Sequence, residues 1–190
     1  MKQLLVLAGI AVVFTGLVGC QGPLSKKSGV DVIIEGGGKF PKLLAGRWKD
    51  AKKGWEFVFE PDGTISSAVI DSGFMAVKPS EGTATKPMKM EGKAVYELGQ
   101  WTVRYSPKER KLSVEVVVDF FHVDLGRDAL EGYSTDSFVG PVSQDWTQWE
   151  AEWMSAPTLI ALTPEPDVLP VDPNDTIQTL LFEKVTENGN

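Results

Sequence analysis

Apolar and polar residues alternate along much of the chain, with the period of two that is typical of strands with one buried face. From Leu112 to Phe120 every even-numbered position is apolar, while three of the odd-numbered positions carry a polar or acidic residue. Such a strand suits an antiparallel sheet that packs one face on a core. We therefore predict that one set of side chains points into the interior, with the last of them nearest an open end: Val114, Val116, Val118, Phe120 and His122.

Two segments have the pattern of a β-hairpin. In "GWEFVFEPDGTISSAVID" (54–71) two strand-like runs flank Pro61-Asp62-Gly63, which favours a tight turn. In "AVYELGQWTVRYSPKERKLSVEVVVDFFHVDL" (94–125) the same design surrounds "SPKER". Further strand-like runs follow at 130–143 and 176–185. The sequence therefore predicts an all-β fold, either a single antiparallel up-and-down barrel of about 8–10 strands or a β-sandwich.

The segment 146–153 has two possible interpretations. Trp146, Trp149 and Trp153 fit one face of a helix, but Trp149 and Trp153 also share a face with a period of two. Because the neighbouring segments are strands and tryptophan favours pleated surfaces, we predict a strand. The four prolines between 164 and 173 predict a stiff loop after it.

The first 20 residues differ from the rest of the chain. Met1-Lys2-Gln3 carries one positive side chain, and 4–18 is then apolar apart from Thr15 and two glycines. A run of about 15 residues matches the apolar region of a signal peptide and is shorter than the roughly 20 residues that span a bilayer. The run ends in Leu17-Val18-Gly19-Cys20, which resembles the lipobox of bacterial lipoproteins.

This resemblance implies a lipid anchor on Cys20, the only cysteine of the chain. In bacterial lipoproteins the thiol receives a diacylglyceryl group, the peptide is cut before the cysteine, and the new amino terminus is acylated, for example with palmitate. Gln21 stands where an aspartate would favour the inner membrane, which implies the outer membrane, facing the periplasm. The expected organisation is a signal peptide over 1–19, a lipidated tether over 20–42, a β-domain over 43–186 and a disordered tail over 187–190.

The start of the β-domain is similar to the lipocalin or calycin group. "LLAGRWK" (43–49) contains a Gly-x-Trp motif at Gly46 and Trp48, and "WEFVFEPDGT" (55–64) resembles the second strand of bacterial lipocalin-like lipoproteins. The resemblance implies a barrel whose closed end is plugged by Trp48. It also implies a basic residue of the last strand against that tryptophan, a position that Lys184 can fill.

Charge and composition argue against several kinds of partner. The formal net charge is −7, and it becomes −8 without residues 1–19, which hold one lysine and no acid. An acidic chain without a basic cluster does not suit nucleic acid. With one histidine and a lipidated cysteine, we expect no metal site, and no motif in the chain indicates a cofactor.

The candidate ligand-binding residues are the aromatic residues and the single histidine. His122 either contacts a ligand near the open end or is satisfied within the structure, and the tryptophans either line a cavity or fill the core. The candidates are His122, Phe120, Trp101, Trp149 and Trp153, with Trp55 as a further tryptophan of the same kind.

These observations favour a non-catalytic protein held at the membrane by the lipid on Cys20. Its lipocalin-like barrel would bind a small apolar ligand or an envelope protein. The alternative is a structural or assembly lipoprotein with a filled barrel. A hydrolase that uses His122 is the third hypothesis, although no nucleophile motif accompanies that residue.

Overall fold

The computed structural model describes residues 29–88, 92–124, 126, 129–163 and 177–186. The predicted signal peptide, Cys20 and the tail over 187–190 lie outside these residues, as does the proline-rich segment from 164.

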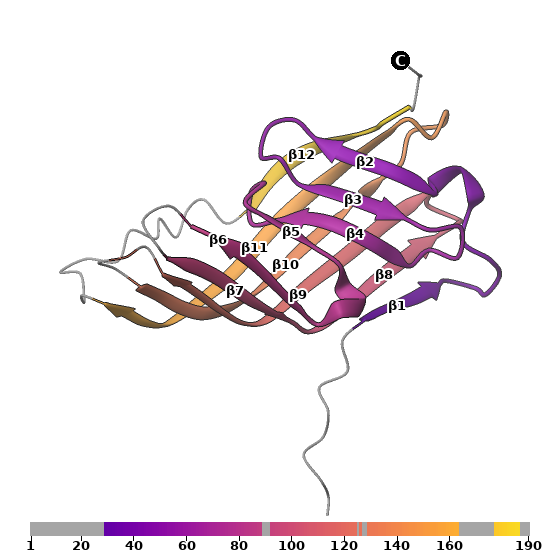
Figure 1. Ribbon diagram of the computed structural model, residues 1–190. Helices are drawn as coiled ribbons and strands as arrows, with labels where there is room; N and C mark the ends of the chain where they lie inside the picture. Colours follow the sequence, from indigo (N-terminus) through magenta and orange to yellow (C-terminus); the bar gives the residue numbers. More distant parts are fainter. Residues whose placement is uncertain (1–28, 89–91, 125, 127–128, 164–176, 187–190) are drawn as a thin grey trace, which may run out of the picture.

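The described residues form twelve β-strands and two short 3-10 helices (Figure 1). The all-β prediction is confirmed, with more strands than the predicted number. The elements are β1 Gly29–Ile34, η1 Lys42–Leu44, β2 Gly46–Asp50, β3 Glu56–Phe59, β4 Ile65–Ile70, β5 Met75–Val77, η2 Pro79–Glu81, β6 Thr83–Pro87, β7 Lys93–Leu98, β8 Gln100–Ser106, β9 Lys111–Asp124, β10 Ala129–Pro141, β11 Gln148–Thr163 and β12 Ile177–Lys184.

The strands form one sheet in the order β1-β8-β9-β10-β11-β12-β2-β3-β4-β5, and all neighbours are antiparallel except β1 and β8. The long strand β9 pairs with β8 near its start and with β7 near its end. The predicted hairpin over 94–125 is therefore present, with its first arm divided into β7 and β8. β6 continues the sheet beside β7.

The sheet curls over so that distant strands pack face to face. β3 and β10 are four places apart in the sheet, yet the rings of Phe57 and Phe138 are 5.3 Å apart, centroid to centroid. Figure 1 shows β2, β3, β4 and β5 lying across the front of β8, β9, β10 and β11. Within the described residues no ladder joins β5 to β1 or β6, so the sheet is curled but not closed by hydrogen bonds.

The strand predicted after Trp146 is confirmed. β11 runs from Gln148 to Thr163, and Trp146 lies in the preceding turn with a left-handed φ of 63°. β11 pairs with β10 over nearly all of its length, so sheet pairing prevails over the helical spacing of the tryptophans.

The sheet begins inside the predicted tether. Gly29–Ile34 pairs with β8, and Phe40 is buried in the core. The part of the predicted tether that lies outside the described residues is 20–28.

A β-bulge changes which side chains of β9 face the core. On β10, Ser134 pairs with Val118 and Gly132 with Phe121, so β9 contributes one residue more than its partner. Against β7, Leu98 pairs with Val118 and the adjacent Glu97 with Phe120, which places the extra residue at 119.

Because of this bulge, the prediction of one continuous inward face holds only for the first part of β9. Val114, Val116 and Val118 are buried as predicted. Beyond the bulge the odd-numbered residues turn inward, so the prediction is wrong for Phe120 and His122, which lie on the opposite face.

Candidate functional site

A partly enclosed cavity of 290 Å³ lies inside the curled sheet. Its walls come from the segment before β3, the end of β4 and its turn, and the facing parts of β7, β9, β10 and β11. The lining residues are Trp55, Ile70, Asp71, Ser72, Tyr96, Val118, Phe121, Val123, Leu130, Ser134, Asp136, Trp153, Ser155, Pro157 and Leu159.

Two pairs of aromatic rings form much of the wall. Trp55 and Trp153 lie with their ring centroids 5.9 Å apart, and Tyr96 stacks on Phe121 at the same separation. Trp55 is almost fully buried, and its indole Nε1 has no hydrogen-bond partner. A buried N–H without an acceptor is uncommon in folded proteins.

Gly132 allows Phe121 to lie flat against β10. A Cβ at this position would stand 2.7 Å from the Phe121 ring and 2.3 Å from the carbonyl oxygen of Thr158 on β11. Only a residue without a side chain fits there. The bulge in β9 and the glycine on β10 together place the Phe121 ring in the cavity wall.

Asp136 is the buried acid of the cavity wall, with 6% of its surface exposed. Its Oδ1 accepts a 3.0 Å hydrogen bond from the Trp153 indole, and the Ser155 hydroxyl also donates to the carboxylate. Burial raises the pKa of Asp136 because the charged form loses its hydration, and the nearby Asp71 carboxylate acts in the same direction. No cation of the described chain forms an ion pair with this carboxylate.

Asp71 is an exposed residue of the cavity wall and belongs to the turn between β4 and β5. The turn needs left-handed backbone at Asp71 and Ser72, whose φ angles are 52° and 51°. The Tyr96 hydroxyl donates a 2.6 Å hydrogen bond to the Asp71 Oδ2. Burial, together with this bond, raises the pKa of Tyr96, so the phenol stays protonated and acts as a donor.

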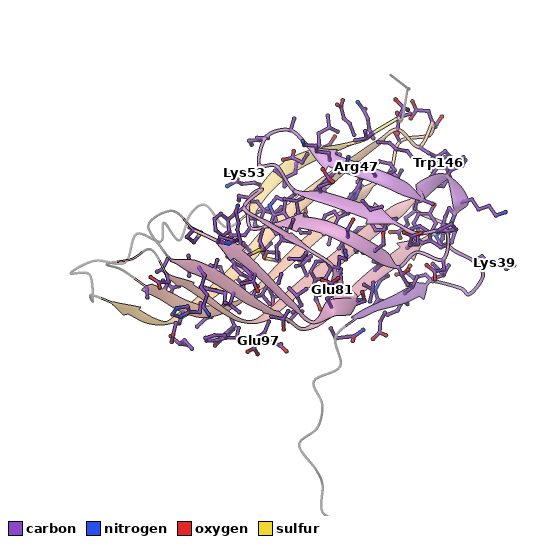
Figure 2. The ribbon with its side chains drawn as sticks, viewed as in Figure 1. Lys39, Arg47, Lys53, Glu81, Glu97 and Trp146 are labelled. Carbon is purple, nitrogen blue, oxygen red and sulfur yellow. The ribbon has the colours of Figure 1, made fainter. Side chains whose placement is uncertain are left out.

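The cavity and the Gly-x-Trp motif lie at different ends of the sheet. The Nζ of Lys53, in the turn between β2 and β3, lies 5.6 Å from the ring centroid of Trp153. Figure 2 shows Lys53 and Trp146 on opposite sides of the part of the sheet that contains Arg47, and the carbonyl of Thr147, next to Trp146, accepts a hydrogen bond from the backbone N–H of Lys184.

The residues predicted for the barrel base lie together at one place. Trp48 is fully buried and donates its indole N–H to the Leu44 carbonyl over 2.8 Å. Lys184 on β12 pairs with Trp48 on β2, and its Nζ lies 5.9 Å from the indole centroid. Gly46 has a φ of 116°, and a Cβ there would stand 3.2 Å from the Lys184 Cε. The glycine therefore makes room for the lysine.

Only some of the predicted ligand-binding residues line the cavity. Trp153 and Trp55 line it. Trp101 is fully buried elsewhere and donates its indole N–H to the Val117 carbonyl, and Trp149 is buried against Phe182 with ring centroids 4.7 Å apart. These two tryptophans fill the core.

His122 and Phe120 lie on the other face of β9, away from the cavity. The His122 Nδ1 lies 2.9 Å from the Glu131 Oε1 on β10, and both side chains are about one third exposed. Phe120 pairs across the ladder with the exposed Glu97. The bulge at 119 is the physical reason for both positions.

Asp136, Asp71 and Tyr96 belong to the cavity, and we did not predict them from the sequence. One signal was present for Asp136: it alternates with Ser134, Phe138 and Gly140 on one face of its strand, so an acid shares a face with a core phenylalanine. Asp71 and Tyr96 are 25 positions apart, and only the curling of the sheet brings them together.

In the part of the chain that the structure describes, no three or more His, Cys, Asp or Glu residues form a group suited to a metal ion. The same residues include no helix long and apolar enough to cross a membrane. Comparisons of the chain with known protein families, with curated proteins and with solved structures give no match.

Proposed function

We propose that this chain is a lipid-anchored protein of the bacterial cell envelope whose cavity binds a small, mainly apolar ligand without catalysing a reaction. The observation that carries the proposal is the cavity of 290 Å³ with aromatic and aliphatic walls and a few buried polar groups. Small-molecule sites have this composition: apolar surface supplies affinity, and a few polar atoms fix orientation.

The volume limits the size of the ligand. An engineered protein cavity of about 150 Å³ holds a benzene molecule. A cavity of 290 Å³ therefore suits a group about the size of two fused rings. This favours a compact ligand over a long acyl chain.

The lipobox supports the anchoring part of the proposal. A diacylglyceryl group and an amide-linked acyl chain on Cys20 would hold the protein stably, because one chain alone binds only reversibly. In this proposal the curled sheet works as a lipocalin-like barrel, with Trp48 and Lys184 at its closed end. The cavity then opens at the other end, toward the periplasm.

The test of the binding site compares two adjacent residues of β10. Ser134 lines the cavity, whereas Thr135 lies on the opposite face of the strand. We expect Ser134→Phe to fill the cavity and abolish the binding of indole to the full-length lipidated chain, measured by calorimetric titration in non-ionic detergent. Thr135→Phe should bind indole as the wild type does. Equal binding by all three proteins, or none by the wild type, would contradict the proposal.

A second candidate function is the binding of an envelope protein through the outer face of β11 and β12. Met154 and Ile177 pair across these strands with exposed fractions of 50% and 64%, and Ile160 is exposed by 58%. Neighbouring exposed apolar side chains such as Met154 and Ile177 are typical of contact surfaces. A photo-crosslinker at position 177 should then give a discrete adduct in cells that one at Arg104, an exposed residue of β8, does not. Absence of that difference would exclude this face.

A further inference from the structure

We propose that the ligand of this cavity is a protonated amine with a compact aromatic or apolar body. This inference rests on the proposed function and adds the chemical class of the ligand. It follows from the charge of the cavity wall, the state of Asp136 and the arrangement of the aromatic rings.

The charge of the cavity wall has one sign. Asp71 and Asp136 are the only lining residues with a carboxyl group, and none of the fifteen lining residues is a lysine, arginine or histidine. With both carboxyl groups ionised, the net charge of the lining residues is therefore negative. An anionic ligand would be repelled by the buried Asp136 carboxylate, where charges are weakly screened, and less by the exposed Asp71.

Asp136 lacks the partner that a buried carboxylate needs. Its two hydrogen-bond donors, the Trp153 indole and the Ser155 hydroxyl, are both neutral. Burying a carboxylate without a cation is costly, and the group either takes up a proton or gains a counter-ion. An ammonium group in the cavity would supply that counter-ion. A neutral ligand would leave the carboxylate without a counter-ion.

The aromatic rings suit the same ligand. The faces of Trp and Tyr attract cations, and Trp55, Trp153 and Tyr96 all line the cavity. The Nζ of Lys53, which is not a lining residue, already lies 5.6 Å from the Trp153 centroid. One cation of the chain therefore already lies over the Trp153 ring.

The volume of the cavity and the hydrogen-bonding groups of its wall also suit an amine ligand. A two-ring body with a short aminoalkyl group is of the size that the volume allows. The hydroxyl of Ser134, another lining residue, can donate to a polar acceptor of the ligand body. The ammonium group would take the position nearest Asp136, with Asp71 as the second carboxylate of the wall.

The experiment compares two probes that share an indole ring, tryptamine with an ammonium group and tryptophol with a hydroxyl group. Calorimetric titration uses the full-length lipidated chain in non-ionic detergent at pH 7. We expect tryptamine to bind roughly tenfold or more tightly than tryptophol, because a hydrogen bond to a charged group is stronger than a neutral one. Asp136→Asn should remove most of this preference. Glu152→Gln, which neutralises an exposed acid next to Trp153 on β11, should keep it.

The outcomes separate this inference from the proposed function. If tryptophol binds as well as tryptamine or better, the cavity binds ligands but the amine inference is wrong. If neither probe binds, the proposed function fails as well. The near-ultraviolet circular dichroism spectrum shows whether Asp136→Asn folds like the wild type. If it does not, the comparison of the two probes in the wild type still decides whether the cavity prefers an amine. A preference for tryptamine that survives in a folded Asp136→Asn protein would overturn the role of Asp136.

Discussion

At the scale of single residues, Asp136 stands out because it is a buried acid without a cation. The Trp153 indole and Ser155 hold it in place, but neither neutralises its charge. Residues of a binding site often destabilise the free protein, and the binding of the ligand then recovers this free energy. Asp136 should therefore lower the stability of the free protein while raising the affinity for a cation.

We expect Asp136→Asn to raise the melting temperature at pH 7. The pKa of Asp136 in the folded protein is raised above its ordinary value of 3.8, so the unfolded chain ionises first as the pH increases. The wild type therefore loses stability between pH 3.8 and the raised pKa, whereas the variant does not. The melting temperature of the variant at pH 7 is therefore expected to exceed that of the wild type.

Calorimetric melting of both proteins between pH 3.5 and pH 7 measures this difference. Asp71 and Tyr96 also line the cavity and Lys53 lies over Trp153, and all three remain in both proteins. A variant that is less stable than the wild type at pH 7 would contradict the account of Asp136.

Trp48 is a central core residue at the end of the sheet where Lys184 lies. It is fully buried, its N–H is bonded to Leu44, and Lys184 lies over its ring. Trp48→Ala should lower the free energy of unfolding by about 3–5 kcal/mol, the range for removing a large aromatic side chain from a core. Urea denaturation followed by circular dichroism measures the change, and a loss below about 1 kcal/mol would contradict the packing described for this end.

At the scale of elements, periodicity predicted the strands and the hairpin turn at Pro61-Asp62-Gly63, because burial of one face repeats every second residue. It did not predict the bulge at 119. One extra residue within 111–124 cannot be recognised from the apolar pattern, because Phe120 and Phe121 both suit a buried position. Hence the sequence pointed to His122 and not to Phe121. Asp136 and Tyr96 became candidates only when the curled sheet set them around one cavity.

Deletion of Asp119 tests the bulge. Removing the extra residue leaves a regular ladder with the same pairs, Val118 opposite Ser134 and Phe121 opposite Gly132. We expect the variant to fold and to keep the cavity, with a loss of about 1–2 kcal/mol, an ordinary value for a single change.

Deletion of Glu115 is the matched control. It would turn either the valines before it or those after it to the wrong face of the sheet. This second variant should lose the cooperative thermal transition, measured by circular dichroism. If the Asp119 deletion fails to fold while the Glu115 deletion folds, the register described for β9 is wrong.

At the scale of the whole molecule, the proposal separates anchoring from binding. Cys20 precedes the first described strand, β1, and contributes to no described part of the sheet. The cavity is built entirely from residues after 54. Anchoring and ligand binding should therefore be separable by substitution.

Replacement of Cys20 by alanine tests that separation. Cys20→Ala should prevent lipidation and release the protein from the membrane fraction, while the melting temperature and the affinity for indole stay within error of the wild type. Mass spectrometry of the membrane-extracted wild type provides the control, and an unmodified Cys20 thiol there would contradict the lipoprotein assignment.

The central claim is that a small ligand binds in the cavity lined by Trp55 and Trp153. Fluorine NMR of the full-length chain labelled with 5-fluorotryptophan tests it most directly, with each resonance assigned by a Trp→Phe substitution. On addition of indole, the resonances of Trp55 and Trp153 should shift, while those of the buried Trp48 and Trp149 stay in place. Unchanged resonances of Trp55 and Trp153 at saturating indole, or shifts confined to other tryptophans, would contradict the claim.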